Sequence, residues 1–157
     1  MAALEPRVPG GETVRPAGMD GLPREGMIPS SWRFIKGPLA AQNESPFLEG
    51  EFWGFSGTTE AYSAKYGAVP AVSKLIVVKL GPAAAAGSLE EAVAAAFGEY
   101  LKDVRREDAS IEGRNDAGRW FLYKRSGPWA ALVLGEPDEA AARARLDVAL
   151  ATAAARR

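Results

Sequence analysis

The stretch SKLIVVKL at residues 73–80 decides the fold class of this chain. Its β-branched and aliphatic residues predict a strand at the centre of a sheet, and Gly81-Pro82 ends it. SLEE at 88–91 is a capping box, and apolar residues recur after it at helical spacing as far as Val104. The pattern therefore predicts a strand followed by an amphipathic helix. Lys102, Arg105 and Arg106 would lie in or after the last helical turn, where positive charge complements the helix dipole.

Further elements are predicted on both sides of this pair. Strands are expected where aromatic and β-branched residues gather between turn sequences, and a helix after Pro137 has a thin, alanine-rich apolar face. The predicted strands cover residues 31–36, 51–55, 110–112, 119–124 and 129–134, the last two as a hairpin, and the other predicted helices cover 59–66 and 138–155. Because no βαβ crossover repeats, the predicted class is α+β, a mainly antiparallel sheet with helices packed on it.

Composition narrows the functional classes. The chain has 157 residues, a formal net charge of -1, and neither Cys nor His. These absences exclude thiolate nucleophiles, thiolate zinc sites and catalytic arrangements built on imidazole. Near-neutral charge argues against nucleic-acid binding, and no apolar run approaches the ~20 residues of a transmembrane helix. We therefore expect a protein that is not an enzyme, holds no cofactor or metal, and binds neither nucleic acid nor a bilayer through a span of its own.

Three motifs resemble reactive sites without completing them. The acidic stretch 107–113 is similar to a calcium loop, but Arg119 stands where the bidentate Glu is needed. Glu49 and Glu51 would share one face of a strand as a carboxylate pair, with no supporting motif. The stretch 54–57 (GFSG) lacks the full nucleophile-elbow spacing, and the chain has no His to activate its serine. We expect structural roles for all three.

Residues 1–27 contain five Gly and four Pro, which disfavour regular structure. They also contain no continuous apolar segment, so no signal peptide is predicted. The sequence predicts an extended N-terminal arm over 1–27 and a single domain over 28–157. Spaced apolar and basic residues in the arm predict docking onto protein subunits of a larger complex. The candidate partner-binding residues are Leu4, Arg7, Val8, Val14, Arg15, Met19, Leu22 and Arg24.

Several short motifs resemble the PsbP-like family of extrinsic photosystem subunits. GMIPSSW at 26–32 is similar to that family's Ile-Pro-x-x-Trp entry, and GSLEEAV at 87–93 resembles the start of its first main helix. The closing hairpin, with Trp120, Tyr123 and residues 129–134, followed by a C-terminal helix, is similar as well. The resemblance covers most of residues 26–155. It implies an α/β/α sandwich and a non-enzymatic peripheral subunit of a photosynthetic membrane complex.

The leading functional prediction is therefore a non-catalytic accessory or scaffold subunit that docks through its arm. The resemblance places it peripherally on the lumenal side of the thylakoid if a targeting peptide has been removed, and the alternative location is the cytoplasm. The alternative function is a soluble small-ligand-binding domain, with aromatic residues around Trp53 and Trp120 lining its pocket. An enzyme ranks third, because no catalytic constellation is visible.

Overall fold

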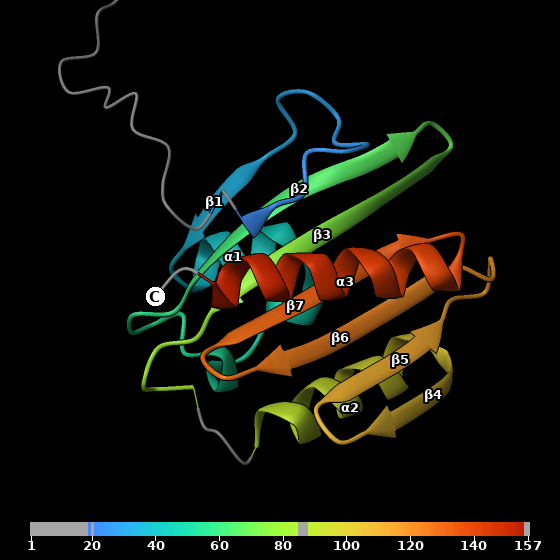
Figure 1. The fold of residues 1–157 in the computed structure, drawn as a ribbon. Helices are drawn as coiled ribbons and strands as arrows, with labels where there is room; N and C mark the ends of the chain where they lie inside the picture. The colour runs from blue at the N-terminus through green and yellow to red at the C-terminus, as the bar shows by residue number, and fades with distance from the viewer. Residues whose placement is uncertain (1–18, 20, 85–87, 156–157) are drawn as a thin grey trace, which may run out of the picture.

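The computed structural model describes residue 19, residues 21–84 and residues 88–155, and this part of the chain forms one seven-stranded sheet. The order across the sheet is β1-β2-β3-β7-β6-β5-β4, and each strand is antiparallel to its neighbours (Figure 1). The predicted α+β class is confirmed. The strands are β1 (Arg33–Lys36), β2 (Glu60–Ala68), β3 (Ala71–Lys79), β4 (Lys102–Glu107), β5 (Ser110–Arg114), β6 (Trp120–Ser126) and β7 (Trp129–Glu136).

Helices cover both faces of the sheet. Helix α3 (Glu139–Ala154) lies across one face, over β7, β6 and β3 (Figure 1). The other face carries α1 (Pro38–Glu44), α2 (Leu89–Tyr100) and the short 3₁₀ helices η2 (Pro46–Leu48) and η3 (Glu51–Trp53). In β3, Leu75 and Val77 point towards α3 and Ile76 and Val78 away from it, and all four are fully buried. The result is an α/β/α arrangement with an α3-side core and an α2-side core.

Two of the later predictions are confirmed closely. Strands β6 and β7 form the expected hairpin, with Ser126 opposite Trp129. Helix α3 follows as predicted, and the Asp138 carboxylate caps it by accepting hydrogen bonds from the backbone amides of Ala140 and Ala141. No helix in the described ranges combines the length and the apolar character that crossing a bilayer requires.

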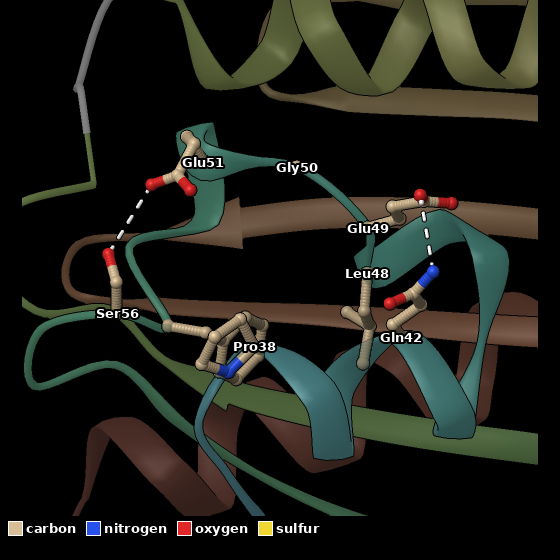
Figure 2. Close-up of a pocket in the computed structure, with 8 residues that line it drawn as sticks. Pro38, Gln42, Leu48, Glu49, Gly50, Glu51 and Ser56 are labelled. Atoms are coloured by element: carbon tan, nitrogen blue, oxygen red, sulfur yellow. Dashed lines mark hydrogen bonds between the residues drawn. The ribbon is translucent and has the colours of Figure 1, made fainter.

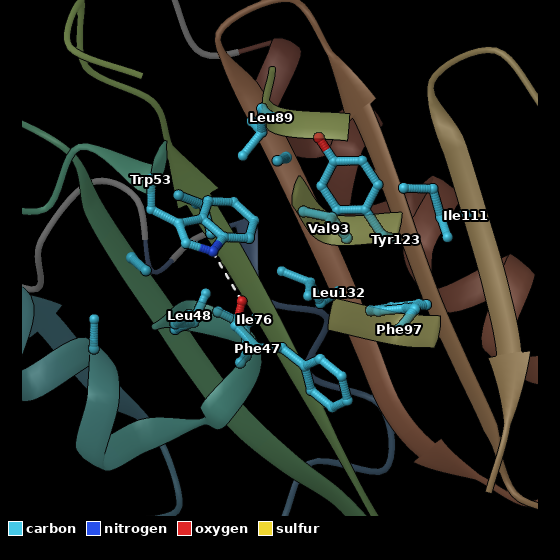
Figure 3. Packing of buried hydrophobic residues seen from close by; sticks show 14 of the residues in the cluster. Phe47, Leu48, Trp53, Ile76, Leu89, Val93, Phe97, Ile111, Tyr123 and Leu132 are labelled. Atoms are coloured by element: carbon cyan, nitrogen blue, oxygen red, sulfur yellow. Dashed lines mark hydrogen bonds between the residues drawn. The ribbon is translucent and has the colours of Figure 1, made fainter. Parts of the chain in front are cut away.

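The strand predicted at residues 51–55 is wrong. Gly50 and Gly54 have φ values of 125° and 74°, and between them the chain makes the turn of η3. This turn inserts Trp53 into the α2-side core, where the side chain is fully buried (Figure 3). Its indole Nε1–H donates a hydrogen bond to the Phe47 carbonyl oxygen at 2.8 Å. Burial of this large side chain outweighs the local preference for extended backbone.

The short helix predicted at residues 59–66 is also wrong, because residues 60–66 belong to β2. Their side chains alternate, with Tyr62, Ala64 and Tyr66 in the α3-side core and Ala61 in the α2-side core. Strand β2 pairs with β1 on one side and β3 on the other. The backbone groups of β2 form hydrogen bonds with two neighbouring strands. The local sequence of β2 does not show that these strands will pair with it.

Helix α2 ends at Tyr100 rather than at Val104, and Lys102–Glu107 forms the edge strand β4. Leu101 and Val104 still pack in the same core as the helix, so apolar spacing continues beyond its end. Arg105 consequently forms an ion pair with Glu112 of β5 at 2.9 Å instead of complementing the helix dipole. The expected capping box is absent, since the Ser88 side chain makes no capping hydrogen bond.

The fold extends back to Met19, ahead of the predicted domain start at residue 28. Met19 and Leu22 are buried in the α3-side core, 1% and 3% exposed. The Tyr66 hydroxyl donates to the Pro23 carbonyl oxygen at 2.7 Å, and the Gly67 amide donates to the Gly26 carbonyl oxygen at 3.1 Å. Residues 21–27 therefore pack on their own sheet instead of extending from it.

Candidate docking surface

The first candidate site is a shallow pocket of about 150 Å³ beside α1, which contains Glu49 and Glu51 (Figure 2). Glu49 lies in the loop after η2 and Glu51 begins η3, so the predicted carboxylate pair on one strand face is wrong. Glu49 accepts a hydrogen bond from the Gln42 side chain at 3.5 Å, and Glu51 accepts one from the Ser56 hydroxyl at 3.4 Å. Each carboxylate faces its own neighbour, and the two lie at opposite ends of the pocket.

The aromatic pocket of the alternative function is not formed. Trp53 is fully buried on the α2 side of the sheet, whereas Trp120 packs against the α3-side core. The guanidinium of Arg114 lies over the Trp120 ring, 5.2 Å from its centroid. The sheet separates the two indoles, so they cannot line one ligand site.

A buried polar network joins α3 to the sheet. Arg145 of α3 forms an ion pair with Glu136 of β7 and donates to the Ser73 hydroxyl of β3 at 2.8 Å. Its guanidinium also lies 4.5 Å from the centroid of the Tyr66 ring. Burial raises the pKa of Tyr66 to about 12, so its hydroxyl stays a neutral donor to the Pro23 carbonyl. The charges of Arg145 and Glu136 pair with each other, and the Tyr66 hydrogen bond fixes Pro23 on the fold.

A second buried tyrosine, Tyr123, also has a raised pKa and a hydroxyl that donates within the fold. The Tyr123 hydroxyl donates to the Glu90 carboxylate at 2.9 Å, and burial followed by the Glu90 charge raises the pKa of Tyr123 strongly. Arg125 lies 3.7 Å from the same carboxylate. In the described residues, every buried side-chain nitrogen and oxygen has a hydrogen-bond partner. These groups are satisfied within the fold and stabilise it.

Two exposed aromatic residues lie at the β1 edge of the sheet, and a third, Tyr100, ends α2. Trp32, just before β1, and Phe34 within it are 41% and 42% exposed. Phe34 and Lys36 share the α3 side of the sheet, because Ile35 between them is buried in the opposite core. The Phe34 ring contacts Tyr62 of β2, with 5.3 Å between centroids. Helix α3 lies over β7, β6 and β3 on this face, and β1 lies beyond β2 at the edge of the sheet (Figure 1). We call Trp32, Phe34 and Lys36, with the backbone edge of β1 that no described strand pairs with, the β1 edge surface.

The backbone direction at this edge follows from the residues just ahead of β1. Ile28 donates to the Lys65 carbonyl oxygen at 2.8 Å, so the backbone groups of Lys65 in β2 face the β1 side. Alternation along β2 then directs Ser63 and Ala61 the same way, and their partners in β1 are Arg33 and Ile35. The N–H and C=O groups of Phe34 and Lys36 therefore point outward, away from β2. Among the described strands none pairs with this side of β1, so outward backbone groups lie next to exposed aromatic rings.

The opposite edge of the sheet is protected differently. Strand β4 presents a mostly charged, exposed sequence, KDVRRE, to solvent. Lys102 is paired with Asp116 at 2.6 Å and Arg114 with Asp103 at 2.6 Å. Asp103 has a φ of 53°, and the register shifts between Lys102 and Arg105. Charge and a bulge are features that block further strand pairing, and β1 has no such bulge.

The predicted partner-binding residues are placed as follows. Leu4, Arg7, Val8, Val14 and Arg15 lie outside the described residues. Met19 and Leu22 are core residues of the domain itself, so their prediction as partner anchors is wrong. Arg24 is exposed. Trp32 and Phe34 are not among the predicted partner-binding residues. The signal for exposure was Lys36, which shares a strand face with Phe34 and leaves Ile35 as the buried residue on the other face.

Comparisons of this chain with protein-family models, with curated proteins and with solved structures found no match.

Proposed function

We propose that this protein is a non-catalytic subunit of a protein assembly and that it docks by strand addition at the β1 edge surface. The observation that carries the proposal is the pairing of two exposed aromatic side chains with outward-directed backbone groups on the same edge. Strand addition uses main-chain hydrogen bonds for affinity and alternate side chains for specificity. Aromatic residues dominate the binding energy of protein interfaces when a partner covers them.

The surface favours a protein partner with apolar or aromatic residues on the strand that it adds. Trp32 and Phe34 supply apolar contact area, and Lys36 on the same face supplies one positive charge. Arg33 is held back from this contact, because its guanidinium donates to the Trp32 carbonyl at 3.0 Å and to the Ser30 carbonyl at 3.4 Å. The proposal requires no cofactor and no metal.

A more specific form of the proposal is a PsbP-like peripheral subunit on the lumenal side of a photosynthetic membrane complex. It rests on the short motifs at 26–32 and 87–93, and the α/β/α arrangement agrees with it. In this form the exposed Arg24 and the residues ahead of it contribute further contacts.

The test is co-migration from source cells solubilised in mild detergent. The wild-type chain is compared with Trp32→Ser/Phe34→Ser, which removes both exposed rings, and with Val148→Ser, which removes an apolar residue 51% exposed on α3. We expect the wild type and Val148→Ser to co-migrate with protein partners and the edge variant to lose them. Migration of the edge variant with unchanged partners would refute docking at β1. The identity of the partners then decides between a photosynthetic complex and another assembly.

A further inference from the structure

The β1 edge surface is complementary to itself. We propose that the strand added to β1 is β1 of a second copy, so that two chains join their sheets across a two-fold axis that passes beside Phe34. This inference rests on the proposed strand addition at β1 and names its partner. Two identical strands related by such an axis run antiparallel, as do all neighbours in this sheet.

The alternation of side chains limits the registers. Residues directly opposite each other in an antiparallel pair point to the same face of the sheet. Phe34 and Lys36 lie on the α3 side and Ile35 on the other. Continuing this alternation one residue ahead of β1 groups Trp32 with Phe34, and Arg33 with Ile35, so a residue must oppose one of its own set. The axis can therefore pass beside Arg33, Phe34 or Ile35, and each choice gives a different set of contacts.

Chemistry favours the axis beside Phe34. The two Phe34 rings then face each other, and Lys36 of each copy faces Trp32 of the other, which is a cation–π pair. The outward N–H and C=O groups of the two Phe34 residues give two backbone hydrogen bonds. Those of Lys36 meet Trp32 just ahead of β1, whose carbonyl also accepts from the Arg33 guanidinium, and add up to about four more. Arg33 stands opposite Ile35, so no like charges are directly paired.

The neighbouring registers are poorer. With the axis beside Arg33, the two arginine side chains oppose each other, which destabilises an antiparallel pair. With the axis beside Ile35, Pro38 follows into the position opposite Trp32, and proline has no N–H to donate. The residue types of this short strand thus select one register without any partner of another kind.

A four-residue strand makes a small interface, so we expect a reversible dimer whose population depends on protein concentration. Sedimentation velocity over a wide concentration range measures it on the full chain. Phe34→Glu places two carboxylates opposite each other at the axis and should raise the dimer dissociation constant at least tenfold. Val148→Glu, the same change at an exposed position of α3, should leave the constant within twofold of the wild type.

Cysteine cross-linking tests the register. The chain contains no Cys, so a single introduced thiol reports one position. Phe34→Cys brings the two Cα atoms to roughly 5.5 Å, within the range of a disulfide. Lys36→Cys, on the same exposed face, separates the two thiols by four residues along the strand, roughly 13 Å. Under mild oxidation we expect a cross-linked dimer from Phe34→Cys and at most a trace from Lys36→Cys.

Equal cross-linking of the two variants, or none from Phe34→Cys, would overturn the inference. A wild-type chain that stays monomeric at every concentration would overturn it too. The proposed function has a separate readout, because the edge variant Trp32→Ser/Phe34→Ser can still be compared for lost partners in cell extracts. A monomeric chain whose edge variant loses other proteins would leave docking at β1 in place and remove the second copy as its partner.

Discussion

Replacing Arg145 by Met tests the buried network that joins α3 to the sheet. The Arg145 and Glu136 side chains are 19% and 10% exposed, and their ion pair links α3 to β7. Arg145 also donates to Ser73 of β3, and its guanidinium lies over the Tyr66 ring. Met is close to Arg in helix propensity, so α3 itself should persist. The variant leaves the Glu136 carboxylate buried, with the Ser73 hydroxyl still donating to it at 2.9 Å.

The expected loss in the free energy of unfolding is about 3–5 kcal/mol, the usual cost of removing one partner from a buried ion pair. Arg143→Met is the matched control on the same helix, because the Arg143 side chain is 51% exposed. Its ion pair with Glu139 lies at the surface, where such pairs contribute about 0–1 kcal/mol, and Glu112, 14% exposed, keeps Arg105 as an ion-pair partner when Arg143 is replaced. Urea unfolding followed by tryptophan fluorescence measures both variants.

A double variant distinguishes the cost of leaving the Glu136 charge unpaired from the cost of losing the packing of the Arg145 side chain. Adding Glu136→Gln to Arg145→Met removes the stranded charge while the Gln side chain still reaches Ser73. We therefore expect the double variant to be more stable than Arg145→Met alone by about 1 kcal/mol or more. The reasoning is refuted if Arg145→Met costs no more than Arg143→Met, or if the two changes at 136 and 145 simply add.

Three further predictions concern the N-terminal residues, acid stability and one tight turn. Deleting residues 1–27 should leave the domain about 3–6 kcal/mol less stable to urea than deleting 1–18, because only the longer deletion removes the buried Met19 and Leu22 side chains; equal stabilities would contradict their role in the core. Burial raises the pKa of Glu44, but hydrogen bonds from Ser63 and Lys74 and the Lys74 charge together hold it below its ordinary value. The charged Glu44 therefore stabilises the fold above its unfolded pKa, and this contribution is lost as the pH falls through the lower folded pKa. Glu44→Gln should flatten the decline in melting temperature below about pH 4.5. An unchanged slope would argue against the Glu44–Lys74 ion pair. Gly67→Ala should lower the free energy of unfolding in urea by about 2 kcal/mol or more, because φ is 92° and a Cβ would lie 2.5 Å from the Ala71 carbonyl oxygen. An unchanged free energy would show that the turn relaxes to accept the Cβ.

The local sequence pattern predicted the type of an element correctly where that element is long and its buried residues follow its own periodicity. The strand at 73–80, the hairpin of residues 119–134 and the final helix are all present as predicted in type, with ends shifted by one to two residues. Each of these has either a continuous β-branched run or turn and capping residues at its ends, and those are local properties of backbone and side chain.

Prediction failed where a distant partner outweighed the local signal. Residues 60–66 are a strand because β1 and β3 flank them, and residues 102–107 leave the helical pattern because β5 pairs with them. Met19 was read as part of a free arm because the many Gly and Pro residues around it disfavour regular structure. Packing on the sheet beside α3 requires no regular structure, so that composition did not exclude it.

The sequence by itself determined the α+β class, the antiparallel hairpin and the absence of thiol and imidazole chemistry, because these depend on residue type and short-range periodicity. The tertiary structure alone decided which aromatic residues meet solvent. Trp32, Phe34 and Trp53 all lie in aromatic stretches that looked alike as predicted strands. Strand order puts Trp32 and Phe34 at an edge of the sheet, whereas the turn at Gly50 and Gly54 buries Trp53 under α2. Exposure is a property of how distant segments pack, and no local pattern contains it.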